Sequence, residues 1–300
     1  MTVGALAVLG AYGCSAIFGI EADRYLVTDA GSGLDAAPVV DAGTDAPLTP
    51  VEAGPWDCLG RPVDPVNPSA QVDLTVLLFD PLQNSTAAGS VDGGSDLVTT
   101  SYTPLTGVSI RYCSIRDPSC NSPSAWVVSD SAGLSEFHVP GDFAGFFEFQ
   151  RSDLLPASFY PGRLLDKETP ITFPSYDFSS DGLQVLASTV TTSPIATDPD
   201  GGLGHAFITM YDCHDHQAAG VSLTIDNSTP ETVVFYTVGG LPTSKTMQTD
   251  NFGLAGAVNV PVGSLTVNAT LAATLTPIGS INVIIRPGAI TFGWVRVRTL

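Results

Sequence analysis

A short segment rich in possible metal ligands, Tyr-Asp-Cys-His-Asp-His-Gln, occupies positions 211–217. If this segment is extended, His214 and His216 project from the same face, as two ligands of one metal ion would. Together with Tyr211 they are the candidate site of a metal-dependent enzyme. The segment directly precedes the apolar run 218–223, and polar residues in that position are also typical of an exposed turn between two strands. We favour the turn and keep the metal site as an alternative.

The sequence contains no complete motif for a calcium site, a catalytic site or a phosphate-binding site. Asp-Pro-Asp-Gly-Gly at 198–202 begins like a calcium-binding loop, but Leu203 stands where glycine is needed and Thr209 where the bidentate glutamate is needed. The sequence has no Gly-x-Ser-x-Gly motif, no His-Glu-x-x-His motif and no phosphate-binding glycine loop. The sequence therefore predicts no catalytic residues, no cofactor and a protein that is not an enzyme.

The first of five cysteines, Cys14, lies in an uncharged run from Val3 to Ile20. Its context, Ala-Tyr-Gly-Cys at 11–14, resembles the lipobox of bacterial lipoproteins, in which the cysteine is lipidated and becomes the first residue after cleavage. The resemblance implies a signal peptide over 1–13, a lipid bilayer as partner of acylated Cys14, and export to the outer membrane or cell surface, with which Ser15 is compatible. An uncleaved N-terminal anchor and a packed core helix are the alternatives, although an anchor needs about 20 apolar residues.

The other four cysteines suggest two disulfides, because an even number is typical of exported proteins and allows three pairings. Cys113 and Cys120 flank an Asp-Pro turn signal, so we expect them to pair across a short loop. Cys58 and Cys213 then pair by elimination. A four-cysteine zinc site is an alternative, although the sequence has no Cys-x-x-Cys pair.

Composition narrows the range of partners. The chain of 300 residues has 30 acidic and 11 basic residues and a net charge of −19. Such a charge argues against a nucleic-acid partner, because phosphates would be repelled. Residues 27–55 contain five acidic residues, no basic residue and no apolar periodicity, which predicts a disordered tether. The lipidated N-terminus and the acidic linker together cover 14–55.

From Trp56 onward the pattern predicts an all-β protein. In 71–80, Val72, Leu74, Val76 and Leu78 alternate with other residues, as in a β-strand. Further strands are expected at 108–113, 125–129, 134–139, 145–150, 205–212, 221–226, 232–238, 256–260, 264–271, 280–285 and 289–298.

Helical spacing occurs once. Leu183, Leu186, Ala187 and Val190 follow the period of a helix, with Ser180 or Asp181 as the N-cap. This short helix is expected in a connector, 179–203, and the valine and threonine residues of the segment leave a strand as the alternative.

Two stretches repeat the same order of features. Gly-Val-Ser-Ile at 107–110 is followed by SDSAGLSEFHVP, and Gly-Val-Ser-Leu at 220–223 is followed by TDNFGLAGAVNVP. Asp130 and Asp250 can each accept hydrogen bonds from amides two residues on, and Gly133 and Gly253 can adopt the positive φ that closes such a turn.

This repeat resembles the carboxypeptidase regulatory-like domain, a transthyretin-like or prealbumin-like β-sandwich with the signature TDxxGxxxxxxVPxG. The second copy carries the best match, with Thr249, Asp250, Gly253, Val260, Pro261 and Gly263. The resemblance implies two tandem antiparallel β-sandwich domains, 56–178 and 204–300, which act as accessory modules.

The expected function is that of a non-catalytic, membrane-anchored surface lipoprotein whose β-sandwich modules bind a protein or glycan ligand or act as spacers. One alternative is a carbohydrate-binding protein that uses surface aromatics, for which the strip of Phe143, Phe146, Phe147 and Phe149 is the candidate. The other is the metal-dependent enzyme with its Tyr/His site in the second domain.

Overall fold

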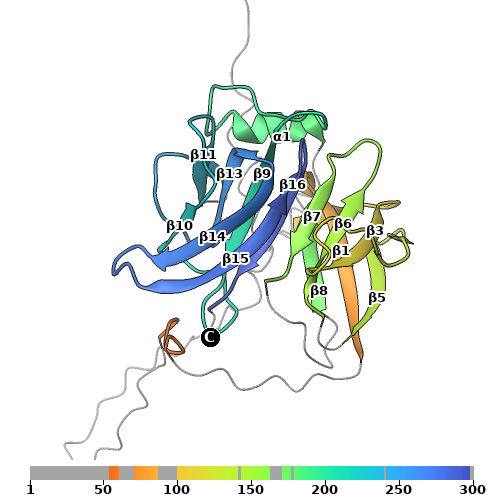
Figure 1. The fold of residues 1–300 in the computed structure, drawn as a ribbon, viewed down its shortest axis with the longest axis horizontal. Helices are drawn as coiled ribbons and strands as arrows, with labels where there is room; N and C mark the ends of the chain where they lie inside the picture. The colour runs from red at the N-terminus through yellow and green to blue at the C-terminus, as the bar shows by residue number, and fades with distance from the viewer. Residues whose placement is uncertain are drawn as a thin grey trace, which may run out of the picture.

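The computed structural model describes residues 54–60, 71–86, 100–140, 143–162, 171–176, 179–239 and 241–297. Within these ranges the chain forms sixteen strands and one short helix (Figure 1), which confirms the all-β fold. The elements are β1 (Gln71–Thr86), β2 (Thr100–Pro104), β3 (Ser109–Ser114), β4 (Val127–Val128), β5 (Leu134–Pro140), β6 (Gly145–Gln150), β7 (Ala157–Tyr160), β8 (Ile171–Tyr176), α1 (Ser180–Ala187), β9 (Leu203–Met210), β10 (Val221–Ile225), β11 (Val233–Val238), β12 (Leu241–Thr243), β13 (Leu254–Pro261), β14 (Gly263–Leu271), β15 (Pro277–Ile285) and β16 (Ile290–Val295).

A nine-stranded sheet with the order β12-β11-β13-β9-β16-β7-β6-β3-β4 forms the centre of the molecule. Its strand β16 lies between β7 and β9 and is parallel to both. Strands from 56–178 and from 204–300 therefore share one sheet. That these two segments fold as separate domains stays a prediction. With the pair β1–β8, three strand pairs among the described residues are parallel, which differs from the antiparallel sheets that we expected.

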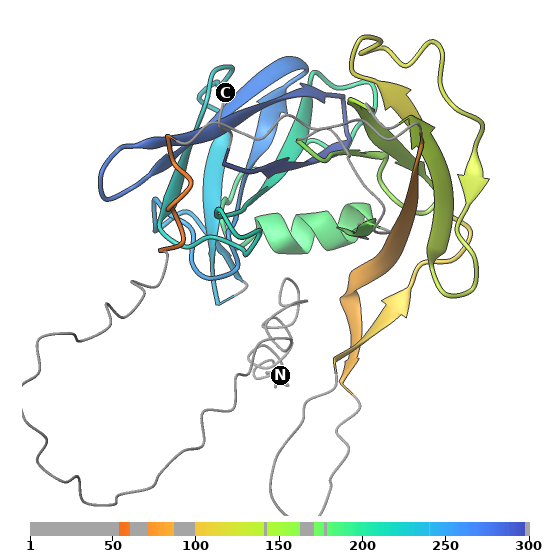
Figure 2. The same ribbon diagram turned by 90° about the horizontal axis from the view of Figure 1, so that it is seen from below.

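Alternating side chains of the central sheet enter two cores on its opposite faces. On one face, Phe147 shares a core with Leu74 of the four-stranded sheet, in which β1 pairs with β2, β5 and β8, and with Leu183 of α1. On the other face, Phe146 shares a core with Val283 of the three-stranded sheet β10-β14-β15. The structure thus has three layers, and Figure 2 shows α1 on the same side of the molecule as β1.

Helix α1 lies where the spacing of apolar residues indicates a helix. Leu183, Leu186 and Ala187 are buried, and Val190 follows the helix but belongs to the same core. The N-cap is Ser179, whose side chain accepts a hydrogen bond from the backbone N–H of Gly182 at 3.1 Å. The expected N-caps, Ser180 and Asp181, are wrong because both already lie inside the helix.

Four strands were not expected, namely β2, β7, β8 and β12. β7 is buried at all four positions, so it lacks the alternation that identifies a half-exposed strand. β8 and β12 each contain a proline, which ordinarily argues against a strand in the middle of a sheet. In the described sheets β12 is an end strand, where a proline is tolerated.

Candidate functional site

The segment 211–217 forms a compact turn after β9. The Asp212 carboxylate, 8% exposed, accepts hydrogen bonds from the backbone N–H groups of His214 (2.8 Å) and His216 (2.9 Å). Asp215 has a φ of 63°, and Tyr211 and Gln217 form a bridge that closes the turn. The segment therefore does not present its two histidines as an extended strand would.

The three candidate metal ligands of this turn lie in different surroundings. The rings of His214 and His216 are exposed, with their centroids 6.2 Å apart. Tyr211 is buried, with the Arg296 guanidinium 4.4 Å from its ring and the Trp294 ring 5.4 Å away. Tyr211 thus belongs to the core, whereas the two histidine rings are exposed.

Each of the two histidines lies beside one carboxylate. His214 Nε2 lies 3.7 Å from Asp57 Oδ1, and His216 Nδ1 lies 3.7 Å from Asp212 Oδ2. Within the described ranges, one group of potential ligand atoms lies within 4.8 Å of one another, and it consists of Cys113, Cys120 and Glu148.

The turn is joined to the start of the folded part by a disulfide between Cys58 and Cys213. The backbone N–H of Cys213 also donates to the carbonyl oxygen of Pro55 at 3.0 Å. This pairing is the one inferred by elimination.

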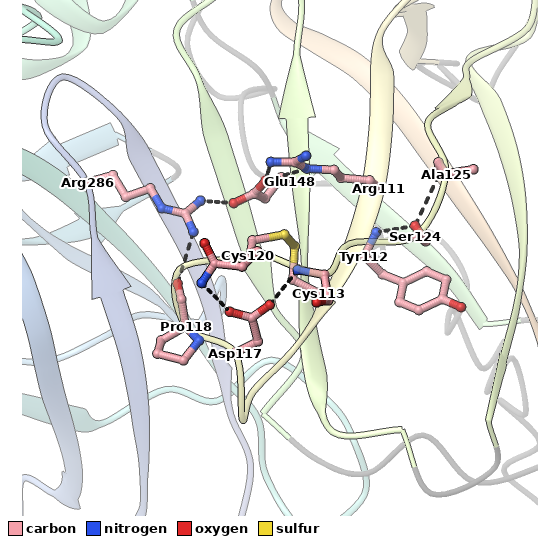
Figure 3. The surroundings of a disulfide bond; sticks show 12 residues. Arg111, Tyr112, Cys113, Asp117, Pro118, Cys120, Ser124, Ala125, Glu148 and Arg286 are labelled. Atoms are coloured by element: carbon pink, nitrogen blue, oxygen red, sulfur yellow. Dashed lines mark hydrogen bonds and ion pairs between the residues drawn. A yellow bond between two sulfur atoms is a disulfide. The ribbon is translucent and has the colours of Figure 1, made fainter.

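The second disulfide, Cys113–Cys120, closes a loop after β3 (Figure 3). Asp117 in this loop accepts hydrogen bonds from two residues that follow the loop, namely the Ser122 backbone N–H (2.7 Å) and the Asn121 side chain (3.2 Å). Hydrogen bonds from Asn121 and Ser122 lower the pKa of Asp117. Because both thiols are joined in the disulfide, they are not available as thiolate ligands beside Glu148.

Glu148 lies on β6 and is 8% exposed. Its carboxylate forms ion pairs with two arginines from distant parts of the chain. Arg111 on β3 approaches Glu148 Oε2 with Nε and Nη2, both at 2.7 Å. Arg286, just after β15, pairs through Nη1 with Oε1 and donates from Nη2 to the carbonyl oxygen of Pro118 at 3.2 Å. The carboxylate therefore joins β3, β6, the loop closed by the disulfide and the end of β15, as Figure 3 shows.

An exposed aromatic ring lies beside this group. The guanidinium carbon of Arg111 is 4.5 Å from the ring centroid of Trp126, and Trp126 is 42% exposed. The phenylalanine strip is not a surface feature, because Phe143, Phe146, Phe147 and Phe149 are 6%, 0%, 0% and 2% exposed. Among the residues whose burial the structure describes, Trp126 is the only exposed aromatic side chain.

Sequence reasoning missed Trp126 and the Arg111–Glu148–Arg286 group. Arg111 lies 37 positions from Glu148, and Arg286 lies 138 positions from it. No local spacing can reveal contacts over such distances, and a single tryptophan carries no sign of its exposure.

The two turns of the repeat have similar geometry. Asp130 Oδ1 accepts from the backbone N–H of Ala132 at 2.8 Å, and Gly133 has a φ of 74°. In the second turn, Asp250 Oδ1 accepts from the N–H of Phe252 at 3.0 Å, and Gly253 has a φ of 59°. These contacts lie in the turns that precede β5 and β13, and they serve the architecture.

Cys14 and most of the expected tether, 27–55, lie outside the described residues. The part of the chain that the structure describes contains no helix with the length and apolar character needed to cross a membrane.

No protein-family model and no curated protein matches the chain. Among solved structures, the shaft pilin SpaA from Lactobacillus rhamnosus GG is similar at 11% identity and a TM-score of 0.24, over 77% of this chain and 99% of the pilin. GBS52, the minor pilin of Streptococcus agalactiae, is similar at 12% identity and a TM-score of 0.22, over 76% of this chain and 97% of that protein.

The Bacillus anthracis TIE protein is similar at 14% identity and a TM-score of 0.22, over 77% of this chain. The match covers 35% of the TIE protein, so this chain spans about a third of its length. TM-scores this low establish neither a shared fold nor a shared function, and the proposals below rest on the residues of this chain.

Proposed function

We propose that this chain is a non-catalytic lipoprotein of the bacterial cell surface, anchored through Cys14, whose β-sandwich body presents a binding surface. The observation that carries the proposal is the pair of disulfides in the described part of the chain. Disulfides persist in oxidising surroundings outside the cytosol, so they support export of the body.

The position of the first disulfide fits an anchored protein. Cys58 lies three positions after the acidic segment 27–55, and its bond to Cys213 joins the chain near the end of that segment to the turn after the central strand β9. A tether attached there holds the body at one defined point, and the rest of the surface stays free for a partner.

The anchoring step can be tested by intact-mass analysis of the full chain extracted from bacterial membranes. We expect a species that begins at Cys14 and carries acyl mass, and Cys14→Ala is expected to abolish the acyl mass. The variant Cys58→Ser/Cys213→Ser serves as the control and should stay in the membrane. A species that begins at Met1 without acyl mass overturns the lipoprotein proposal.

A metal-dependent enzyme is the weaker candidate, because Tyr211 is buried in the core while the two histidines are exposed. Metal analysis of the purified full chain tests it. One equivalent of iron or zinc that is lost in His214→Ala/His216→Ala would favour the enzyme over the binding module.

A further inference from the structure

The surface beside β4 combines an exposed aromatic ring with a fixed arginine. We name it the Trp126 platform and define it as Trp126, Arg111, Glu148 and Arg286. Arg111 covers one face of the Trp126 ring at 4.5 Å, and the ring nevertheless stays 42% exposed. The exposed part of Trp126 is therefore accessible to a ligand even with Arg111 in place.

The platform is held in place before any ligand arrives. Arg111 uses Nε and Nη2 to bind Glu148, and the same carboxylate is fixed from its other side by Arg286. Arg286 in turn donates to Pro118 within the loop closed by Cys113–Cys120. Since these side chains are already ordered, binding would not incur the usual entropic cost of ordering them.

One hydrogen-bonding group of the platform has no hydrogen-bond partner among the described residues. Arg111 Nη1 makes no hydrogen bond or ion pair with the described residues, while the Arg111 side chain is 25% exposed. A guanidinium group prefers oxygen acceptors with negative charge, above all carboxylate, phosphate and sulfate groups.

The charge of the platform contrasts with the rest of the chain. Arg111 and Arg286 outnumber Glu148, so the platform has an excess positive charge in a protein with a net charge of −19. An anionic ligand is therefore attracted to this place and repelled by most of the remaining surface.

The size of the apolar area indicates what kind of anion fits. A stable protein–protein interface buries about 800 Å² on each partner, whereas the exposed aromatic surface here is one indole ring. One face of a pyranose ring presents C–H bonds over an area similar to an indole, and these bonds favour the electron-rich face of the aromatic ring. We infer that the Trp126 platform binds an acidic saccharide, with one sugar ring packed against the exposed part of Trp126 and a carboxylate or sulfate of a neighbouring sugar on Arg111. This inference rests on the proposed binding function and names its ligand class.

The first test is a glycan array probed with the purified full chain. The array carries galacturonate, alginate, hyaluronan, sialylated and sulfated oligosaccharides, each beside a neutral counterpart, together with poly-L-glutamate. We expect binding to at least one acidic saccharide that is at least about tenfold tighter than to its neutral counterpart. Equal binding to the neutral counterpart, or no binding to any saccharide, overturns the inference.

The second test measures the affinity of the strongest acidic oligosaccharide by calorimetry. Trp126→Ala is expected to weaken binding by at least about tenfold, as for the removal of an aromatic anchor, and Trp126→Phe should retain most of it. Met247→Ala is the matched control, since this apolar side chain is 81% exposed and lies just after β12, the opposite edge strand of the central sheet. Arg111→Gln should remove the preference for the acidic over the neutral sugar.

Each variant is first shown to melt like the wild type, so that a loss of binding is not a loss of folding. Unchanged binding by Trp126→Ala overturns the platform. If the protein binds poly-L-glutamate in a way that depends on Trp126 and binds no saccharide, the saccharide inference is overturned. The ligand would then be an acidic protein. If the array shows no saccharide binding and the chain is acylated at Cys14, the proposal of an anchored surface protein is retained. Only the inference of a saccharide ligand is then overturned.

Discussion

The glycines of the repeated turns illustrate how backbone geometry can require one residue type. Gly253 has a φ of 59°, a conformation that residues with a side chain rarely adopt. A Cβ atom added there would lie 2.6 Å from the carbonyl oxygen of Met210 and 2.7 Å from the backbone nitrogen of Ala218. Both the backbone angle and the space therefore exclude a side chain.

Gly253→Val is expected to lower the free energy of unfolding by more than the roughly 1–3 kcal/mol of backbone strain, because the clash with backbone atoms adds to it. Urea denaturation measures the change. Gly220→Val is the matched control, since Gly220 has a φ of 75° and no atom within 4 Å of the added Cβ, so it should show the strain alone. A Gly253→Val variant that melts like the wild type would contradict the turn.

His205 is a buried titratable group in a polar network that holds the connector before β9. It is 0% exposed, its Nδ1 accepts from the backbone N–H of Asn259 at 3.4 Å, and its Nε2 then donates to the carbonyl oxygen of Ala196 at 2.7 Å. The Asn259 side chain binds the same connector, with Oδ1 accepting from the Ala196 N–H at 3.0 Å. Burial lowers the pKa of His205 from 6.5 to about 4.

This pKa predicts a loss of stability in mild acid. Between pH 6.5 and about 4 the unfolded chain binds a proton at His205 and the folded chain does not, so stability decreases as the pH falls through this window. The full difference corresponds to about 3 kcal/mol. Denaturation at a series of pH values should show this decrease in the wild type, and His205→Gln should lack that part of the slope. Equal slopes in both proteins would contradict the neutral buried histidine.

Helix α1 has one face that packs into the core and one face that is exposed to solvent. Leu183 is 0% exposed and packs into the core between the central and four-stranded sheets, whereas Val185 on the same helix is 67% exposed. The helix is only eight residues long, so most of its stability must come from this packing.

Leu183→Ala is expected to lower the free energy of unfolding by about 2–5 kcal/mol, because it removes buried methyl groups and leaves a cavity. Val185→Ala is the control on the same helix and should change stability by less than about 0.5 kcal/mol, since it leaves no cavity. Both are measured by chemical denaturation. Similar losses in the two variants would mean that α1 does not pack on the sheet as described.

In the molecule as a whole, strand β16 connects the two halves of the chain. It pairs with β7 over four residue pairs and with β9 over six, and both pairings are parallel. The salt bridge of Arg286 with Glu148 and the disulfide Cys58–Cys213 also join distant segments. The two halves are therefore expected to unfold together, although the repeat in the sequence indicates two units.

Calorimetry of the protein tests this coupling. We expect a single thermal transition, and two separated transitions would favour two independent domains. Loss of the long-range disulfide in Cys58→Ser/Cys213→Ser should destabilise more than loss of the short one in Cys113→Ser/Cys120→Ser, because the closed loops span separations of 155 and 7 residues. The chain-entropy argument gives about 5 and about 2.5 kcal/mol. The reverse order would contradict it.

Features that depend on neighbouring residues could be predicted from the sequence. The alternation in β1, the helical spacing before Val190 and the Asp-x-x-Gly turns each involve positions only a few residues apart, so local sterics and hydrogen bonding are sufficient to specify them. The pairing of Cys113 with Cys120 belongs to the same class, because the turn between them brings the two side chains together.

The features on which the proposed binding depends come from contacts between distant segments. The insertion of β16 between β7 and β9 has no local pattern, because either side of a buried strand can accept a partner. The phenylalanine strip is buried because sheets cover both faces of β6, while Trp126 stays exposed beside the edge strand β4. Large apolar side chains are thus buried or exposed according to whether another sheet packs against them. This depends on contacts between segments that are far apart in the sequence.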